Sequence, residues 1–173
     1  MSLILSGTDG VQDNSGAIVR GTVSTTTGGT SIDFTSIPNW IKRITLILSG
    51  VSTNGTTTVR AQIGTSGTPT TSGYTSDCIQ ATSAGTVTLT QLTNGFYVGT
   101  PTLANASFKG TLVLVNVTGN TWVCNGNVAD STNNRVYVSS GNVALGGVLD
   151  NIRLTINGTD NFDVNGGVNI IYE

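Results

Sequence analysis

Histidine is absent from the 173 residues of this chain, and glutamate occurs once, as Glu173. The absence of histidine excludes the Ser/His/Asp and Cys/His nucleophile systems and every histidine-based metal site. A glycosidase needs two carboxylates about 5 to 10 Å apart. The remaining acidic residues are aspartates that lie mostly beside glycine or asparagine, where aspartate commonly caps its own turn. We therefore expect no enzymatic activity and no cofactor.

Charge of either sign is scarce. Lysine, arginine, aspartate and glutamate make up 9% of the chain, against about 25% in a typical domain. The basic residues are scattered and form no basic stripe for a phosphate backbone, so nucleic acid is not an expected partner. The surface must instead present hydroxyl and amide groups. The basic residues are scattered along the chain as Arg20, Lys42, Arg43, Arg60, Lys109, Arg135 and Arg153.

Long apolar runs are also missing. No run approaches the roughly 20 apolar residues that span a bilayer, and Met1 to Gly7 lacks the basic region of a secretory signal. We expect a protein that is made in a cytoplasm and does not engage a membrane. Two cysteines without a secretion signal are typical of reduced core thiols, so Cys78 and Cys124 are predicted to form no disulfide.

Glycine, threonine, serine and asparagine are abundant, with 23 glycines alone. Apolar residues make up 37% of the chain, which is enough to form a core, while the good helix formers Glu and Lys are nearly absent. About a dozen short strand-like segments recur every 8 to 12 residues or so. The sequence predicts an all-β antiparallel β-sandwich, jelly-roll-like and almost without helix. This sandwich is expected to form one domain, residues 18–173, preceded by an arm, residues 1–17.

The clearest structural signal is the segment from Ile37 to Gly55, which predicts one long central strand. Pro38 marks its beginning, and Asn54-Gly55 supplies the residues of a tight hairpin. Ile44, Leu46 and Leu48 fall on one face by the period of two and are expected in the core. Thr58 to Ile63 is then the returning arm of this hairpin.

Three further patterns predict strands and their faces. Phe108 to Val117 is continuously apolar, which predicts burial on both faces, in the middle of a sandwich or under a subunit contact. Arg135 to Val138 alternates, with Val136 and Val138 expected inward. Ile152, Leu154 and Ile156 share one face of a strand that Asn157-Gly158 closes into another hairpin, and Phe162 to Val164 and Val168 to Tyr172 form the last strands.

Polar loops are the candidate binding segments. Gly64 to Thr75 is apolar only at Tyr74 and is expected to form a long surface loop, either a binding site or a solvated connection. Asn125 to Asn134 is a second polar stretch. The aromatic residues able to stack on sugars are Trp40, Trp122, Tyr74, Tyr97 and Tyr137. Trp40 and Trp122 adjoin apolar runs and are assigned to the core, and Tyr74 in its loop is the favoured exposed candidate. Candidate receptor or glycan contacts are Tyr74, Thr71, Ser72, Asn133 and Asn134.

Asp160 to Asn165 carries oxygen ligands at alternating positions that suit Ca²⁺. It lacks the bidentate glutamate that completes an EF-hand loop. A turn is therefore the favoured interpretation, and no metal site is assigned.

Three parts of the chain resemble a module that recurs in bacteriophage structural and fibre proteins. The first is the opening segment, and the second is the central strand with the residues that follow it. The third is the C-terminal segment, and together the three cover nearly the whole chain in order. The residues are Ser2 to Gly10; Ile37 to Thr45 and Gly50 to Gly55; and Leu149 to Leu154, Asn157 to Asp160, Phe162-Asp163 and Val168 to Glu173.

The resemblance implies a bacteriophage virion structural protein, a homotrimer displayed on the particle surface as a decoration, head-fibre or tail-fibre component. Other virion proteins of the capsid or tail are then its partners. The arm from Ser2 to Ala17 is the implied attachment element, with Leu3, Ile4, Leu5, Asp9 and Val11 as its contact residues. The alternative is a receptor-binding tail-fibre tip that recognises a host cell-surface glycan through the polar loops.

Overall fold

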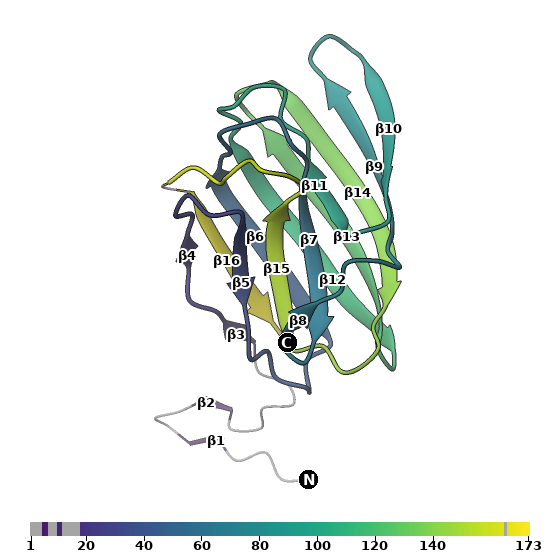
Figure 1. Ribbon diagram of the computed structural model, residues 1–173. Coiled ribbons are helices and arrows are strands. Elements are labelled where there is room, and N and C mark those ends of the chain that lie inside the picture. Colours follow the sequence, from purple (N-terminus) through teal and green to yellow (C-terminus); the bar gives the residue numbers. More distant parts are fainter. Residues whose placement is uncertain (1–4, 7–9, 12–17, 165) are drawn as a thin grey trace.

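The computed structural model describes residues 5–6, 10–11, 18–164 and 166–173. Two antiparallel sheets pack face to face, and the described residues contain strands and turns but no helix (Figure 1). The predicted all-β sandwich is therefore confirmed, whereas the jelly-roll connectivity stays a prediction. No helix among these residues is long and apolar enough to cross a membrane.

The larger sheet has nine strands and the smaller has five. In the larger sheet the order is β10 (Val87–Leu92), β9 (Thr75–Thr82), β14 (Arg135–Ala144), β13 (Thr121–Asp130), β12 (Phe108–Thr118), β6 (Arg43–Val51), β16 (Gly167–Tyr172) and β3 (Val19–Arg20), with β4 (Ser24–Thr25) also pairing with β16. In the smaller sheet the order is β11 (Phe96–Gly99), β7 (Val59–Thr65), β15 (Asn151–Ile156) and β5 (Ser31–Phe34), with β8 (Thr68–Pro69) pairing with β7. A separate pair is formed by β1 (Leu5–Ser6) and β2 (Gly10–Val11).

The core lies between the two sheets and follows the alternation of each strand. Ile44, Leu46 and Leu48 of β6 are buried, as predicted, and so are Ile152, Leu154 and Ile156 of β15 on the opposing sheet. Each such side chain contributes about 1.5 to 3 kcal/mol when it leaves water. The period of two therefore identifies the inward face of both strands correctly.

The asparagine-glycine dipeptides do not close hairpins between neighbouring strands. Asn54-Gly55 leads from β6 in the large sheet to β7 in the small sheet, and Asn157-Gly158 leads from β15 to β16. The first predicted hairpin is wrong because β6 already pairs with β12 and β16, which leaves no free edge for β7. The second is wrong because β15 already pairs with β5 and β7, which leaves no free edge for β16. Gly55 serves a close approach instead, since a Cβ there would lie 2.1 Å from a carboxylate oxygen of Asp160.

Several predicted boundaries and faces also change. The central strand begins at Arg43 instead of Ile37, because Pro38 lies in a turn that places its carbonyl oxygen near the Ile41 N–H. Phe162 makes only an isolated bridge to Thr53 and is not part of a strand. In β12 only one face is buried within this chain, since Val115 is exposed on the other.

Val136 and Val138 of β14 point outward, so the prediction for this strand is wrong by one residue. Tyr137 and Ser139 point inward in their place. The Tyr137 hydroxyl donates to the carbonyl oxygen of Thr100, 2.7 Å away, and the Ser139 hydroxyl donates to that of Tyr97, 2.9 Å away. Both acceptors lie in the β11 region of the opposing sheet. The two buried hydroxyl groups are therefore hydrogen-bonded by the other layer of the sandwich.

Candidate functional site

The segment from Gly64 to Thr75 is not a long open loop. β7 continues to Thr65, a tight turn at Ser66-Gly67 reverses the chain, and β8 pairs back onto β7. Tyr74 is only 3% exposed and packs edge-on against Phe96. Its hydroxyl accepts from the Ile63 N–H at 2.9 Å and donates to the Ile63 carbonyl oxygen at 3.1 Å. Tyr74 is therefore a core residue, and its assignment as an exposed sugar-stacking aromatic is wrong.

The other four candidate contacts do not gather into one site. Thr71 and Ser72 are exposed just before β9 begins, whereas the Asn134 carbonyl oxygen accepts from Ser83, just after β9 ends. β9 has eight residues, so the two groups are separated by about 25 Å at 3.3 Å per residue. Asn133 is engaged locally, since its side-chain amide donates to the buried carboxylate of Asp130.

The Asp160 to Asn165 segment uses its carboxylates to hold the β6–β7 connection. Asp160 accepts from the backbone N–H and the hydroxyl of Thr57, and these bonds lower the pKa of Asp160 below its usual range. Asp163 accepts from the Ser52 hydroxyl. The described residues contain no group of three potential metal ligands. Asn165 lies outside the described residues.

The remaining sequence-based candidates divide between core and arm. Trp122, Tyr97 and Tyr137 are buried, and half-buried Trp40 packs against Tyr172 with ring centroids 6.2 Å apart. Of the arm residues, Leu5 pairs with Val11 between β1 and β2, whereas Leu3, Ile4 and Asp9 lie outside the described residues.

Both cysteines are free and buried between the sheets. Burial raises the pKa of the Cys78 thiol to about 12, and it raises the pKa of Cys124 as well. A thiol that stays protonated at neutral pH is a poor nucleophile. The two cysteines are therefore packing residues.

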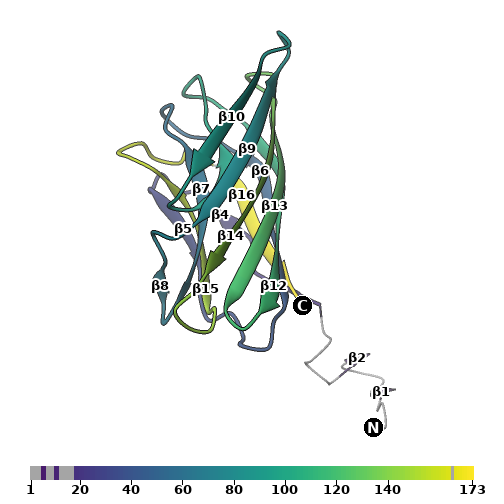
Figure 2. The ribbon, with the colours of Figure 1, turned by 90° about the vertical axis from the view of Figure 1, so that its right-hand side faces the viewer.

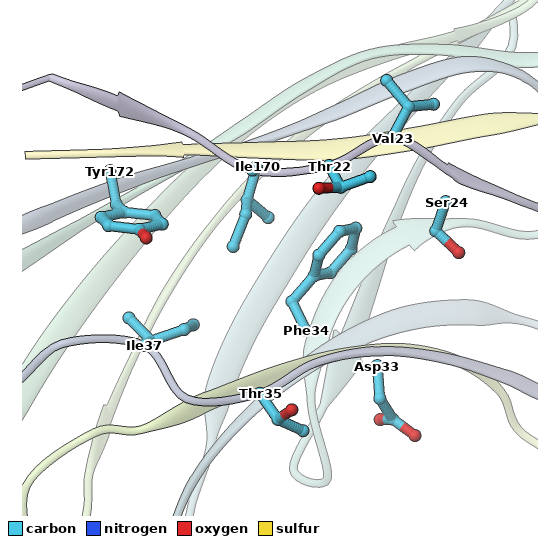
Figure 3. Close-up of a pocket in the computed structure, with 10 residues that line it drawn as sticks. Thr22, Val23, Ser24, Asp33, Phe34, Thr35, Ile37, Ile170 and Tyr172 are labelled. Atoms are coloured by element: carbon cyan, nitrogen blue, oxygen red, sulfur yellow. The ribbon is translucent and has the colours of Figure 1, made fainter.

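A cleft of about 390 Å³ opens where the β3–β4 edge of the large sheet faces β5 of the small one. Phe34 and Tyr172 point into this space from the two sides, whereas Asp33 points away from it (Figure 3). The Asp33 carboxylate is paired with the guanidinium of Arg153. Apolar side chains and hydroxyl groups therefore line the cleft, and its one carboxylate is already engaged.

Exposed apolar side chains gather on the outer face of the large sheet, across β10, β9 and β14. Ile79 lies directly opposite Leu89 on one side and Val138 on the other, and Ala81 lies between Val87 and Val136 in the same way. Directly opposed residues share a face of the sheet. We call this surface the apolar patch. Its large side chains and their exposed fractions are Ile79 (49%), Val87 (66%), Leu89 (71%), Val136 (42%) and Val138 (53%).

The sequence interpretation missed this patch for two reasons. The alternation of Arg135 to Val138 predicts Val136 and Val138 inward, and Ile79 and Leu89 lie on separate strands whose pairing only the fold decides. One local signal was present, because Val87 to Thr90 alternates apolar residues with threonine and the strand contains no charge. Alternation by itself does not show whether the apolar face meets a core or solvent.

A polar hollow of about 510 Å³ lies next to the apolar patch on the same face. Thr75, Asp77, Asn125, Ser140 and Asn142 surround it with hydroxyl, amide and carboxylate groups. The Thr75 hydroxyl donates to the Asn142 side chain, and the Gln91 amide donates to Asp77 at 2.9 Å. The outer face of the large sheet therefore combines an apolar half and a hydrogen-bonding half.

No protein-family model matches this chain, and neither the curated proteins nor the solved structures include a significant match to it.

Proposed function

We propose that this chain is a non-enzymatic structural protein of the bacteriophage virion surface, a decoration or fibre component that assembles with copies of itself and attaches through its N-terminal arm. The resemblance of the sequence to phage structural modules supports the location. The number of copies that this resemblance implies is three. The apolar patch carries the argument for self-assembly.

Five large aliphatic side chains in adjacent rows are unusual on the surface of a monomeric protein, where apolar residues are normally scattered singly. The patch residues carry no charge, and neither do Thr88 and Thr90 between them on β10. A second protein surface that covered this patch would remove apolar area from water without desolvating an ionic group. These properties favour a protein contact over a contact with solvent.

The N-terminal arm is also arranged so that it can contact another protein. β1 and β2 pair with one another and with no strand of the sandwich, and they lie beyond the end of the sandwich where β3 begins (Figures 1 and 2). An element that precedes the folded body and shares no sheet with it is suited to hold another protein.

The aspartates of the described residues favour a structural role. All six accept hydrogen bonds or form ion pairs within the chain: Asp33 with Arg153, Asp77 with Gln91, Asp130 with Ser107, Asp150 with Gly67, Asp160 with Thr57 and Asp163 with Ser52. Carboxylates used in this way stabilise turns and connections.

Self-assembly is tested by light scattering on the purified chain. We expect a mass of several chains for the wild type and a smaller mass for Val138→Lys, which places a charge within the patch. Val117→Lys is the matched control, because Val117 is 58% exposed on β12 outside the patch. A monomeric wild type, or equal effects of the two substitutions, contradicts this role of the patch.

The virion location needs a separate experiment on the particles of the phage that encodes the chain. Antibodies against the purified protein should label the particle surface in electron microscopy. The purified chain without residues 1–17 should fail to bind particles that lack the protein, while the full chain binds them. Labelling that is absent from the particles, or attachment that survives the deletion, contradicts the proposal.

Recognition of a host cell-surface glycan is a second candidate function, and the polar hollow is the observation that favours it. Its hydroxyl, amide and carboxylate groups are of the kinds that hydrogen-bond sugar hydroxyls. Asn125→Ala should then weaken saturable binding of the labelled protein to host cells, whereas Thr71→Ala should not. Binding that purified surface polysaccharide fails to compete away contradicts this candidate.

A further inference from the structure

β10 is the last strand of the large sheet and is open on three sides. Among the strands that the structure describes it pairs only with β9, and Val87 to Gln91 are all exposed. Figure 2 shows the β9–β10 hairpin extending past the rest of the sandwich. The edge of β10, its outer face and its inner face therefore all meet solvent in a single chain.

The other sheet edges carry the features by which proteins block strand pairing. β5 bears Asp33 with its partner Arg153, and β3 is two residues long and includes Arg20. β11 is four residues long with an irregular register between Tyr97 and Gly99, and Pro101 follows it. Charges, shortness, bulges and proline all discourage an added strand.

β10 has none of these features. It runs for six residues, Val-Thr-Leu-Thr-Gln-Leu, without charge, proline or glycine. Its register with β9 is uninterrupted from Val87 to Leu92. A regular, uncharged and exposed edge of this kind is a template for another strand.

The hydrogen-bond pattern of the hairpin shows which backbone groups are available. Thr82 donates its N–H to the Thr86 carbonyl oxygen at 3.0 Å, so Thr82 and Thr86 form a hydrogen-bonded pair. Bonded and non-bonded pairs alternate along an antiparallel ladder. Thr88, Thr90 and Leu92 therefore bond toward β9, and Val87, Leu89 and Gln91 direct their N–H and C=O groups outward.

We propose that β10 pairs antiparallel with β10 of a second copy of this chain, across a two-fold axis at Leu89. This inference deepens the proposed self-assembly and rests on it. Leu89 then lies opposite Leu89 of the second copy, and Val87 lies opposite Gln91 on either side. This symmetric register is the one that uses all three outward residues of both strands, which makes about six inter-chain hydrogen bonds.

The strand itself indicates that the occupant is another copy. On the inner face Thr88 meets Thr90 of the second copy, and on the outer face Leu89 meets Leu89. Threonine pairs and aliphatic pairs are favourable across strands, and like charges are unfavourable. β10 carries no charge that the two-fold axis would duplicate. The pairing also brings the two apolar patches side by side on one continuous outer face.

Cross-linking tests the register directly. In a hydrogen-bonded antiparallel pair the opposed Cα atoms lie about 5.5 Å apart, which suits a disulfide. Leu89→Cys should give a covalent dimer under mild oxidation, reversible by reductant, in non-reducing gel electrophoresis. Val117→Cys is the exposed control, and the buried native cysteines make the wild type a second control. Leu89→Cys that cross-links no better than Val117→Cys overturns the proposal.

A proline substitution in β10 tests the edge pairing separately from the folding of the chain. Leu89→Pro removes an N–H that points away from β9, so the hairpin keeps its bonds and the circular dichroism spectrum should be unchanged. The same substitution should halve the assembly mass in light scattering. An unchanged mass with a native spectrum overturns the edge contact. A spectrum that has lost its β signal overturns the assignment of the Leu89 N–H to the outer edge.

The wild-type mass distinguishes this inference from the proposed function. A two-fold contact requires an even number of chains, such as two, or six when a three-fold contact joins three pairs. A mass of three chains overturns the β10 pairing and leaves self-assembly standing. A mass of one chain overturns both.

Discussion

At the scale of single residues, the interior of this sandwich contains hydroxyl and carboxyl groups that bond to the backbone of a neighbouring segment. Tyr74 bonds to both backbone groups of Ile63, and Tyr137 bonds to Thr100. Buried Asp130 accepts from the backbone N–H groups of Ser107, Thr132 and Asn133. The bonds of Tyr74, of Tyr137 and of Asp130 to Ser107 join separate segments of the chain. The bonds of Asp130 to Thr132 and Asn133 hold the turn that follows Asp130.

The Tyr74 hydroxyl gives the first prediction at this scale. Tyr74→Phe keeps the ring against Phe96 but leaves the N–H of Ile63 without its partner, while the Ile63 carbonyl oxygen keeps its bond from the Thr70 N–H at 2.9 Å. An unsatisfied buried group costs about 1 to 3 kcal/mol. Urea denaturation should show a decrease of this size in the free energy of unfolding. Ser72→Ala, on the exposed segment nearby, should change it by less than about 0.5 kcal/mol. Equal stability of the two variants would show that Tyr74 makes no such bond.

Alkaline pH gives the second prediction. Burial raises the pKa of Cys78 from 9.0 to about 12 and that of Tyr137 from 10.0 to about 12. Between the ordinary pKa of each group and its raised pKa, the unfolded chain loses a proton that the folded chain keeps. The free energy of unfolding therefore falls as the pH rises through this range. The thermal unfolding midpoint should be at its plateau below pH 9 and should decrease from pH 9 to 12. Cys78→Ala should make that decrease less steep, and an unchanged slope would contradict the assignment.

At the scale of elements, glycines inside the long strands allow close approach to a neighbouring strand. A Cβ at Gly141 of β14 would lie 2.3 Å from the Thr75 carbonyl oxygen on β9. Gly110 of β12 has a φ of 144°, at the irregularity where the register with β6 shifts. These positions bend or tighten the large sheet at defined points.

Gly110 provides the prediction for this scale. Gly110→Ala would bring a Cβ to 2.1 Å from the Asn127 carbonyl oxygen at a φ that side chains rarely adopt. We expect a loss of about 2 to 4 kcal/mol in the free energy of unfolding, measured by urea denaturation. Gly146→Ala is the matched control, since a Cβ there meets nothing within 4 Å. A loss no larger than that of Gly146→Ala would mean that β12 relaxes freely at this point.

At the scale of the whole molecule, the two sheets differ in size and in what their edges expose. The small sheet covers the middle of the large one, and β10 lies beyond it (Figure 1). The ion pairs, Arg43 with Glu173 and Arg153 with Asp33, involve β6, β15 and β5. The ion pairs of the described residues therefore lie away from β10 and the apolar patch, whose own residues carry no charge.

The salt dependence of assembly follows from this distribution. Because the apolar patch and β10 carry no charge, raising sodium chloride from about 0.05 to 0.5 M should not weaken the association, as it weakens contacts between exposed ions. Ammonium sulfate should strengthen it, because excluded salts favour apolar burial. Light scattering across a dilution series at each salt concentration measures both effects. Dissociation at high sodium chloride would place the contact on a charged surface instead.

The sequence by itself determined the class of the fold and the inward faces of its most regular strands. Ile44, Leu46 and Leu48, and likewise Ile152, Leu154 and Ile156, were predicted correctly because alternation is a local property of a strand with one buried face.

Only the tertiary structure decided which sheet each strand joins and which side of a strand meets solvent. Asn54-Gly55 crosses between sheets because the edges of β6 are occupied by β12 and β16, and Tyr74 is buried because Ile63 offers it partners. Val138 faces outward because Tyr137 finds its acceptor in the opposing layer. The apolar patch arises from the register of three strands separated in sequence. Which strands pair depends on all the strands that can occupy each sheet edge, so the residue pattern of one strand does not predict its neighbours.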